Sequence, residues 1–199
     1  MCIEVIHIGK CGGTTTLRLL QDYHIQHRQI HTKKPLFDDT CKYLILIRNP
    51  VDRFISAFNW RYKLVVLDKT QEYRFAGEKE TLLHYGCVNH LAENIDTLDV
   101  YIHHIHEDIH YYLGDFLQTC NRENILGVIT QEDLNNDMQR IFNISNNKIH
   151  KKNNAYTDKY VSKRGRHLLK RYLYKDYACI DTLFSMGCLT QQQYDVLSK

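Results

Sequence analysis

A loop of glycine and threonine around one lysine stands near the start of the chain and could bind an anion. It reads His7-Ile-Gly-Lys-Cys-Gly-Gly-Thr-Thr-Thr16, after an apolar stretch and before a helical one. Backbone N–H groups at a helix N-terminus attract phosphate, and glycines let the backbone come close to it. Lys10 would place a positive charge beside a bridging phosphate oxygen, and the hydroxyls of Thr14, Thr15 and Thr16 could donate to peripheral oxygens. Seen alone, the loop also fits a tight turn with an exposed lysine.

Two other phosphate chemistries fit this loop poorly. A Walker A loop needs a lysine directly after its last glycine, where Thr14 stands, and this disfavours ATP hydrolysis. Cys11 at a helix N-terminus could be an acidic thiolate. However, the Cys-x5-Arg loop of a cysteine phosphatase needs arginine where Leu17 stands, and Arg18 comes one residue too late.

A second segment combines an arginine and a serine in a way that suits a phosphate monoester. The apolar run Tyr43–Ile47 is followed by Arg48-Asn-Pro-Val-Asp-Arg-Phe-Ile-Ser56. Arg48 is expected at the end of a strand and Ser56 about two turns into the next helix, so that both could face one ligand. A guanidinium makes forked hydrogen bonds to phosphate, and a hydroxyl adds a short one. Without the first motif, an arginine at a strand end and a serine packed in a helix would be the simpler interpretation.

The elements that must position these motifs alternate between strands and helices. The pattern predicts strands at 3–8, 29–32, 43–47 and 125–129, and helices at 14–23 and from Pro50 to about Leu67, with further helices elsewhere. This alternation indicates an α/β fold, a three-layer sandwich with a central parallel sheet and a P-loop-like strand, loop and helix at its start. Ligands bind such sheets at the carboxyl ends of the strands, where both motifs fall.

Composition indicates one folded domain, residues 1–199. Hydrophobic residues make up 43% and charged residues 25% of the 199, as in ordinary globular proteins, and neither a repeat nor a linker divides the chain. The net charge of +3 is compatible with anionic ligands and gives no sign of a nucleic-acid surface.

Targeting signals and cysteine spacing favour a reducing, cytoplasmic location. No run approaches the ~20 apolar residues that cross a bilayer, and the first strand starts so near Met1 that a signal peptide has no room. The seven cysteines include no Cys-x-x-Cys pair and are odd in number, which predicts neither a zinc knuckle nor a disulfide framework.

Together the two motifs resemble those of the sulfotransferases that use 3′-phosphoadenosine 5′-phosphosulfate (PAPS). Lys10-Cys-Gly-Gly-Thr-Thr15 is similar to the family's loop for the 5′-phosphosulfate, and 48–56 to its segment for the 3′-phosphate, in the same order. The resemblance is closest to the carbohydrate (heparan-type) branch and its soluble microbial or viral relatives, and it continues more weakly through 127–134 and 168–183. Gly9 stands where many members have proline, a departure that removes no phosphate donor.

This resemblance implies an enzyme that transfers a sulfuryl group from PAPS to an acceptor hydroxyl, expected on a saccharide, with PAP as the product and no metal. Lys10 would stabilise the charge on the leaving phosphate, and Arg48 and Ser56 would hold the 3′-phosphate. The expected contacts of the 5′-phosphosulfate are Lys10, Cys11, Gly12, Gly13, Thr14, Thr15 and Thr16. Neither a nucleic-acid partner nor a membrane anchor is expected.

The general base is expected to be His31, since several carbohydrate sulfotransferases carry their base at the corresponding place after the second strand. Glu80, His84 and His104 lie in the variable middle region and remain alternatives. The neighbouring Lys33 and Lys34 fit either contacts with an anionic acceptor or a solvated pair.

A competing motif, His106-Glu-Asp-Ile-His110, matches the zinc-hydrolase pattern His-Glu-x-x-His. On a helix it would place His106 and His110 on zinc, with Glu107 as the base. A third ligand is not obvious, although Glu132 is conceivable. Three alternatives to the sulfotransferase therefore stay open: this zinc hydrolase, another nucleotide-dependent phosphotransferase, and a binding protein of the same fold without catalysis.

Overall fold

The computed structural model of the chain describes residues 2–31, 33–69, 75–102, 105–106, 108–145 and 156–199. The chain divides into two compact units. The first comprises Met1–Asn49, Asp108–Lys151 and Lys175–Lys199, and the second comprises Pro50–Glu107 and Lys152–Tyr174. The expectation of a single domain over residues 1–199 stays a prediction.

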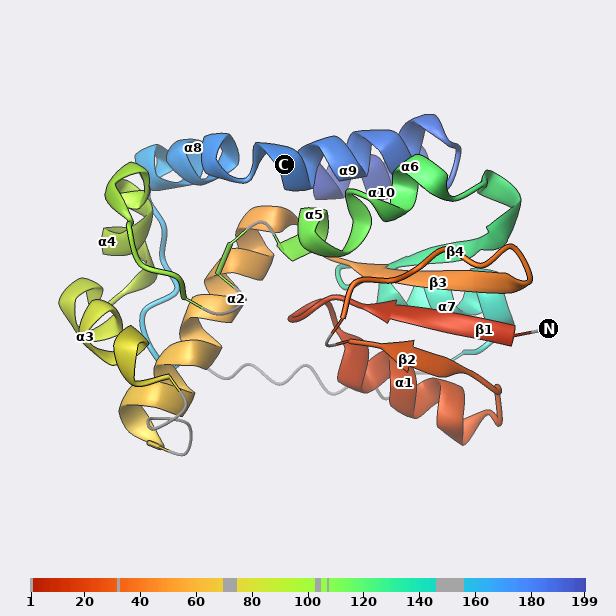
Figure 1. Cartoon of the computed structure of the whole chain (residues 1–199), viewed down its shortest axis with the longest axis horizontal. Helices are drawn as coiled ribbons and strands as arrows, with labels where there is room; N and C mark the ends of the chain where they lie inside the picture. Colours follow the sequence, from red (N-terminus) through yellow and green to blue (C-terminus); the bar gives the residue numbers. More distant parts are fainter. Residues whose placement is uncertain (1, 32, 70–74, 103–104, 107, 146–155) are drawn as a thin grey trace. The chain divides into compact units, whose positions relative to one another are not determined.

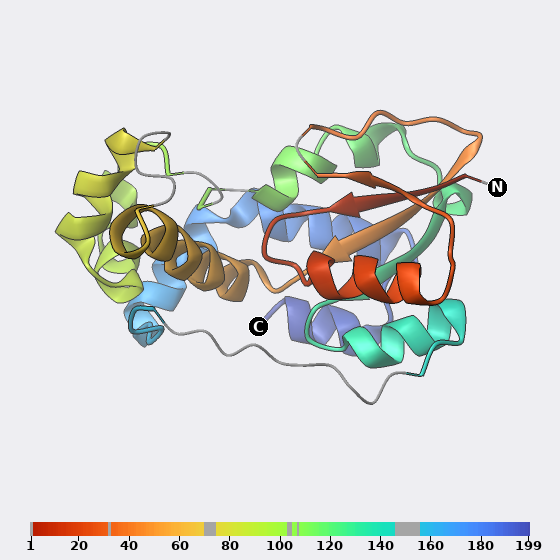
Figure 2. The same cartoon turned by 90° about the horizontal axis from the view of Figure 1, so that it is seen from below.

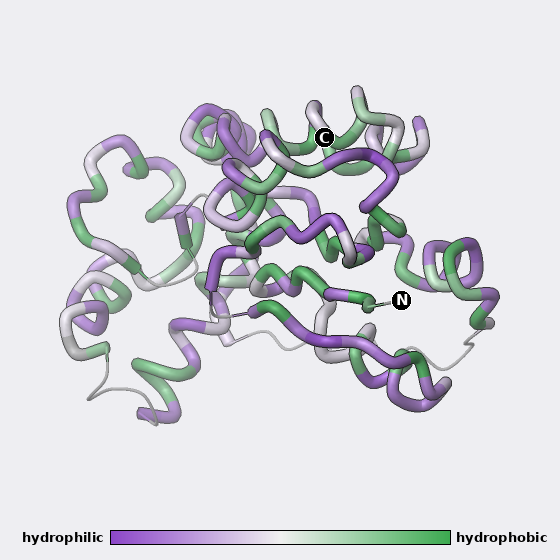
Figure 3. Tube along the Cα trace, turned by 45° about the vertical axis from the view of Figure 1, so that its right-hand side comes forward, coloured by the Kyte–Doolittle hydropathy of each residue, from purple (hydrophilic) through white to green (hydrophobic). Residues whose placement is uncertain are grey.

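The described part of the first unit contains a four-stranded sheet whose strands all run parallel, in the order β2-β1-β3-β4 (Figure 1). Its strands are β1 (Cys2–His7), β2 (Arg28–Ile30), β3 (Cys41–Ile47) and β4 (Ile125–Thr130). The central strand β3 is buried except at Lys42, which explains its nearly continuous apolar sequence. Figure 3 shows apolar residues along these strands.

Helices cover both faces of the sheet and so confirm the predicted α/β three-layer sandwich (Figures 1 and 2). On one face lie α1 (Gly13–Asp22) and α7 (Leu134–Phe142). On the other lie α5 (Asp108–Leu113), α6 (Phe116–Thr119) and α9 (Tyr174–Ser185), and the short η3 (Arg122–Asn124) leads into β4. Beside the edge strand β4 lies α10 (Gln191–Leu197), where the side chain of Gln193 donates a hydrogen bond to the carbonyl of Val128 at 3.2 Å.

The described part of the second unit consists of helices joined by loops, without a strand. The expected helix from Pro50 to about Leu67 is present as α2 (Pro50–Tyr62), which continues as the π-helix η1 (Lys63–Leu67). The other elements are α3 (Ala76–Tyr85), α4 (Val88–Glu93), η2 (Ile95–Thr97) and α8 (Lys163–Tyr172). None of the helices in the described ranges is long and apolar enough to cross a membrane.

Paired charges lie inside this helical unit. Arg61 and Glu78 form an ion pair at 3.0 Å, with side chains only 4% and 8% exposed. The fully buried Arg53 donates to the carbonyl of His106 at 2.5 Å. Buried charges persist only where a partner compensates them, so these contacts specify how the helices pack.

Candidate functional site

The connection between β1 and α1 is a tight loop that turns the chain back onto the sheet. Two of its residues, Lys10 (φ 70°) and Gly12 (φ 79°), have left-handed backbone conformations. Glycine adopts this conformation without steric strain, whereas a lysine in this conformation is strained. Strained residues of this kind concentrate at functional sites, and here the half-buried Lys10 is the cation of the predicted phosphate loop.

The carbonyl of Gly12 organises the first turn of α1. It accepts hydrogen bonds from the backbone N–H groups of Thr15 and Thr16, each at 3.1 Å, and from the buried hydroxyl of Thr16 at 3.3 Å. Thr16 therefore supports the loop from within. Thr14 is exposed and Thr15 is half-buried, so these two hydroxyls are better placed to meet a ligand. No acidic side chain lies in this first turn, which leaves the positive end of the helix dipole uncompensated.

Glycine is required at position 13 because the imidazole of His7 occupies the space where a side chain would be. A Cβ built on Gly13 would collide with Nε2, Cδ2 and Cε1 of His7. At Gly12 a Cβ would come within 3.1 Å of Gln131 Cγ, in addition to the strain of its positive φ. The two glycines thus let the loop pack against β1 and against the segment after β4.

His31, the expected base, lies one residue past β2 and is half-buried beside His7. Its Nδ1 is 2.8 Å from the backbone carbonyl of His7, and the two imidazoles stack with centroids 4.1 Å apart and an interplanar angle of 13°. The hydroxyl of the buried Tyr112 donates to the carbonyl of His31. On the other side, Gln29 Nε2 is 2.7 Å from Nδ1 of His7. Sequence reasoning missed His7, Gln29 and Tyr112 in these roles.

Arg48 follows β3, the strand beside β1, so it and the loop share the carboxyl edge of the sheet. Its Nε atom is buried and donates no hydrogen bond to another described residue, and it lies 3.8 Å from a carboxylate oxygen of Glu132. That same oxygen accepts a hydrogen bond from the backbone N–H of Asn49 at 3.0 Å. Glu132, considered from sequence as a zinc ligand, therefore lies beside Arg48. Ser56 is half-buried in α2 of the second unit, so its partnership with Arg48 stays a prediction.

The zinc motif does not lie on one helix. Helix α5 begins at Asp108, so His106 precedes it. Both ring nitrogens of His106 already have hydrogen-bond partners: the hydroxyl of Tyr172 is 2.6 Å from Nδ1, and the N–H of Ile102 is 3.2 Å from Nε2. The helical premise of the zinc interpretation is therefore wrong.

The remaining alternatives for the base lie in different places. Glu107 and His104 fall outside the described residues, while Glu80 and His84 are exposed on α3 of the second unit. Of the candidates that lie among the described residues, His31 contacts the strand that leads into the loop 10–16, whereas Glu80 and His84 belong to the second unit.

One group of side chains elsewhere could hold a metal. Cys2, Glu4 and Cys41 place their ligand atoms within 4.8 Å of one another at the opposite end of the sheet from the loop. The guanidinium of Arg28 lies among them, 2.8 Å from Glu4 and 3.8 Å from the sulfur of Cys41. The positive charge of Arg28 therefore already compensates the negative charge of this cluster.

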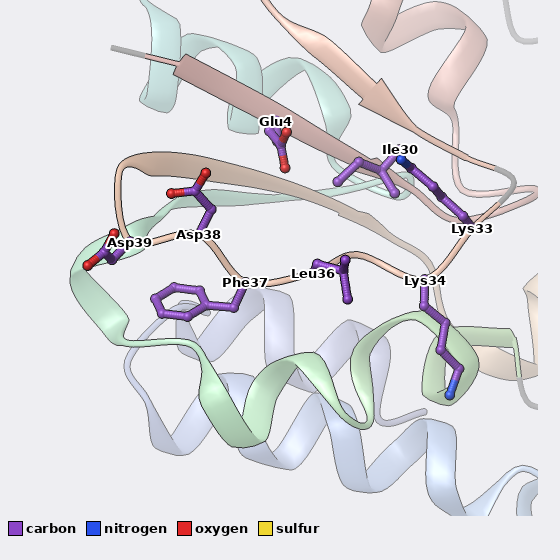
Figure 4. Close-up of a pocket in the computed structure, with 8 residues that line it drawn as sticks. All are labelled: Glu4, Ile30, Lys33, Lys34, Leu36, Phe37, Asp38 and Asp39. Atoms are coloured by element: carbon purple, nitrogen blue, oxygen red, sulfur yellow. The ribbon is translucent and has the colours of Figure 1, made fainter.

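A groove is lined by residues from β2 and from the segment that follows it, among them Ile30 and Lys33. It has a volume of about 710 Å³, large enough for a small ligand, and Figure 4 shows two lysines at one end and two aspartates at the other. Its lining residues are Glu4, Ile30, Lys33, Lys34, Leu36, Phe37, Asp38 and Asp39. The ammonium of Lys34 donates a hydrogen bond to the carboxylate of Asp115 at 2.8 Å. This ion pair raises the pKa of Lys34 and lowers the pKa of Asp115. Lys33 is exposed, so it is the lysine better suited to a ligand.

Cys11 is fully buried, and this argues against the cysteine-phosphatase alternative. Burial also raises the pKa of Cys120 to about 11 and raises the pKa of Cys41 and of Cys188. Only a thiolate reacts with an alkylating reagent. We therefore expect iodoacetamide at mildly alkaline pH to label the half-buried Cys2 and Cys87 first, as measured by peptide mass spectrometry. Labelling of Cys11 as fast as Cys87 would contradict this and restore Cys11 as a reactive group.

Fold and site together define an α/β protein with a glycine-rich loop between a strand and a helix, and with an arginine at the carboxyl edge of a parallel sheet. A sulfotransferase domain model matches residues 10–160, about three quarters of the chain. The chain belongs to the sulfotransferase family, whose members transfer a sulfuryl group to an acceptor hydroxyl. No curated protein and no solved structure matches the chain significantly.

Proposed function

We propose that this protein transfers a sulfuryl group from PAPS to a hydroxyl of a saccharide and releases PAP. The observation that carries the proposal is that the loop 10–16 and Arg48 follow adjacent parallel strands, so that a glycine-rich loop and a guanidinium lie at one edge of the sheet. Membership of the sulfotransferase family supports sulfuryl transfer. PAPS is proposed as the donor because the two motifs resemble those of sulfotransferases that use it.

The residues present fit a doubly phosphorylated donor. Gly12 and Gly13 add no side chain at the start of α1, where backbone N–H groups attract anions. The buried Nε of Arg48 has no hydrogen-bond partner among the described residues, which suits an anion subsite. The proposed contacts of the 5′-phosphosulfate are Lys10, Cys11, Gly12, Gly13, Thr14, Thr15 and Thr16. Arg48 and Ser56 are proposed for the 3′-phosphate.

When bound, PAPS supplies the sulfuryl group: a bond forms from the acceptor oxygen to sulfur, the bond from sulfur to the bridging phosphate oxygen breaks, and the hydroxyl proton passes to a base. Lys10 is proposed to stabilise the negative charge left on that phosphate, which removes the need for a metal ion. His31 is proposed as the base. Its Nδ1 must carry a proton because the carbonyl of His7 can only accept, so the neutral ring has its basic lone pair on Nε2.

We assign the saccharide acceptor to the groove lined by Ile30 and Lys33, residues close to His31 in the chain. Carboxylates such as Asp38 and Asp39 accept hydrogen bonds from sugar hydroxyls, and Lys33 could contact an anionic substituent. The seven cysteines, none of them in a disulfide, suit a reducing compartment. We therefore propose a cytoplasmic site of action.

Calorimetric titration in EDTA with PAP, ATP and 5′-AMP tests the donor. A hydrogen bond to a charged group contributes about 1.5–3 kcal/mol, so we expect PAP to bind about 10- to 100-fold more tightly than 5′-AMP. Equal affinities would overturn the proposed donor, and a preference for ATP that requires magnesium would favour a phosphotransferase.

A matched pair of variants assigns that selectivity to Arg48. Arg48→Ala should reduce PAP affinity to nearly that of 5′-AMP. Arg18→Ala should leave it unchanged because Arg18 is exposed on α1 and pairs with Asp22 at 4.0 Å. If Arg48→Ala weakened both nucleotides equally, Arg48 would not be the 3′-phosphate group.

A further inference from the structure

His7 is the last residue of β1, and its ring lies between the expected base and the phosphate loop. In the parallel pairing of β1 with β2, Val5 is opposite Gln29 and Ile6 is opposite Ile30. The next pair in this register is His7 and His31. The sheet therefore brings the two histidines side by side, and their imidazoles stack almost in parallel.

His7 holds His31 in two ways. Its carbonyl oxygen accepts a hydrogen bond from the Nδ1–H of His31, with 2.8 Å between nitrogen and oxygen, and its ring covers one face of the His31 imidazole at a centroid distance of 4.1 Å. Tyr112, which is 4% exposed, holds the backbone of His31 through the carbonyl. The ring of His31 is thus fixed in both tautomer and orientation.

The ring of His7 is itself fixed from the other side. Gln29 Nε2 can only donate, so Nδ1 of His7 accepts its hydrogen bond at 2.7 Å. The Nε2 edge of the same ring lies against Gly13, where no side chain could fit. A continuous set of contacts therefore runs from the first residue of α1 through His7 to His31.

We propose that His7 is the positioning residue of the catalytic base: its stacked ring holds His31 so that Nε2 meets the acceptor hydroxyl beside the phosphate loop. This inference rests on the proposed function. It assigns His7 no contact with the acceptor and no proton of its own to transfer. A small misplacement of a reacting group lowers the rate strongly even when binding is intact, which is the effect expected if His7 is lost.

Turnover and donor binding of His7→Ala separate positioning from a structural role. The backbone carbonyl survives this substitution, and only the ring is lost. We expect kcat to fall about 10- to 100-fold while the Kd for PAP changes less than about twofold. As a control, His27→Ala removes another half-buried histidine, whose Nδ1 is 2.8 Å from the carbonyl of Ile25, and should leave kcat unchanged.

The ring ¹⁵N shifts of His31 provide a readout that does not depend on turnover. In the wild-type protein they should be those of one Nδ1–H tautomer. In His7→Ala the ring of His31 loses its stacking partner and can turn away from the carbonyl that fixes the tautomer, so the shifts should move toward an average of both tautomers. Unchanged shifts together with unchanged kcat would overturn the inference. So would a parallel loss of PAP affinity and kcat, because His7 would then serve the donor site.

Failure of the proposed function can be distinguished from failure of the positioning role of His7. If the protein showed no sulfuryl transfer, or if His31→Ala kept full turnover, then the assignment of the base would be wrong while the ¹⁵N shifts still tested whether His7 positions His31. If His31→Ala is inactive and His7→Ala retains wild-type turnover, His31 is the base and the positioning role of His7 is wrong.

Discussion

Replacing Lys10 with glycine should abolish most sulfuryl transfer and leave the protein at least as stable as before. Removing one group that stabilises transition-state charge costs on the order of 10²- to 10³-fold in kcat. Lys10 has a left-handed backbone, φ 70°, which costs a residue with a side chain about 1–2 kcal/mol. Glycine relieves that cost and loses about 0.5–1 kcal/mol through its more flexible unfolded state. Thermal unfolding and turnover, measured on the same samples, give the two quantities.

Lys10→Met and Lys163→Met complete this test. Lys10→Met keeps the strained backbone and removes only the charge, so it should be as inactive as Lys10→Gly and somewhat less stable. Lys163, exposed at the start of α8, is a matched lysine whose replacement should change neither quantity. Wild-type turnover in either Lys10 variant would remove Lys10 from the proposed mechanism, and a lower melting temperature for Lys10→Gly would show that the lysine stabilises the loop.

Sequence reasoning located the strands and the loop between β1 and α1 because these depend on local patterns. A few neighbouring residues are enough to predict a buried strand from the apolar run of β3 and a tight turn from the glycines before α1. Even the helix from Pro50 to Leu67 was predicted in extent, although its change to π-helical geometry at Lys63 was not. The pattern of apolar residues does not specify whether each backbone N–H donates to the carbonyl four or five residues earlier, which is the difference between an α-helix and a π-helix.

The contacts that the sequence did not predict arise from strand order and register. His7 and His31 meet because β1 pairs with β2, and Glu132 reaches Arg48 because β4 pairs with β3. Neither pairing is encoded in the spacing of these residues along the chain. The zinc motif failed for the opposite reason: its spacing has meaning only on one helix, and α5 begins two residues after His106.

Gly13→Ala is expected to damage both stability and transfer, although alanine is ordinarily the better residue in a helix. Gly13 is the first residue of α1 and does not have a positive φ, so its backbone would accept alanine. The three atoms nearest to the methyl group all belong to the ring of His7. That ring is held by Gln29 and by the stack on His31, so it yields at a cost. Overpacking of this kind costs about 1–3 kcal/mol, measurable by thermal or urea unfolding.

Gly77→Ala is the matched control. A Cβ at Gly77, in α3, would meet nothing within 4 Å, so this substitution should be neutral or should stabilise the protein by up to about 1 kcal/mol. The contrast between the two glycines tests whether the cost at position 13 comes from the crowding there or from glycine replacement in general.

A double-mutant cycle identifies the crowding residue. If the imidazole of His7 is what excludes a side chain at position 13, then Gly13→Ala should cost far less in the His7→Ala background, with a coupling energy close to the whole cost of the single substitution. PAP affinity should recover in the double variant because the loop regains its conformation, whereas turnover should stay low because His31 has lost its stacking partner. Additive costs would instead place the obstruction outside His7, and the contact between the phosphate loop and the base would lose its physical basis.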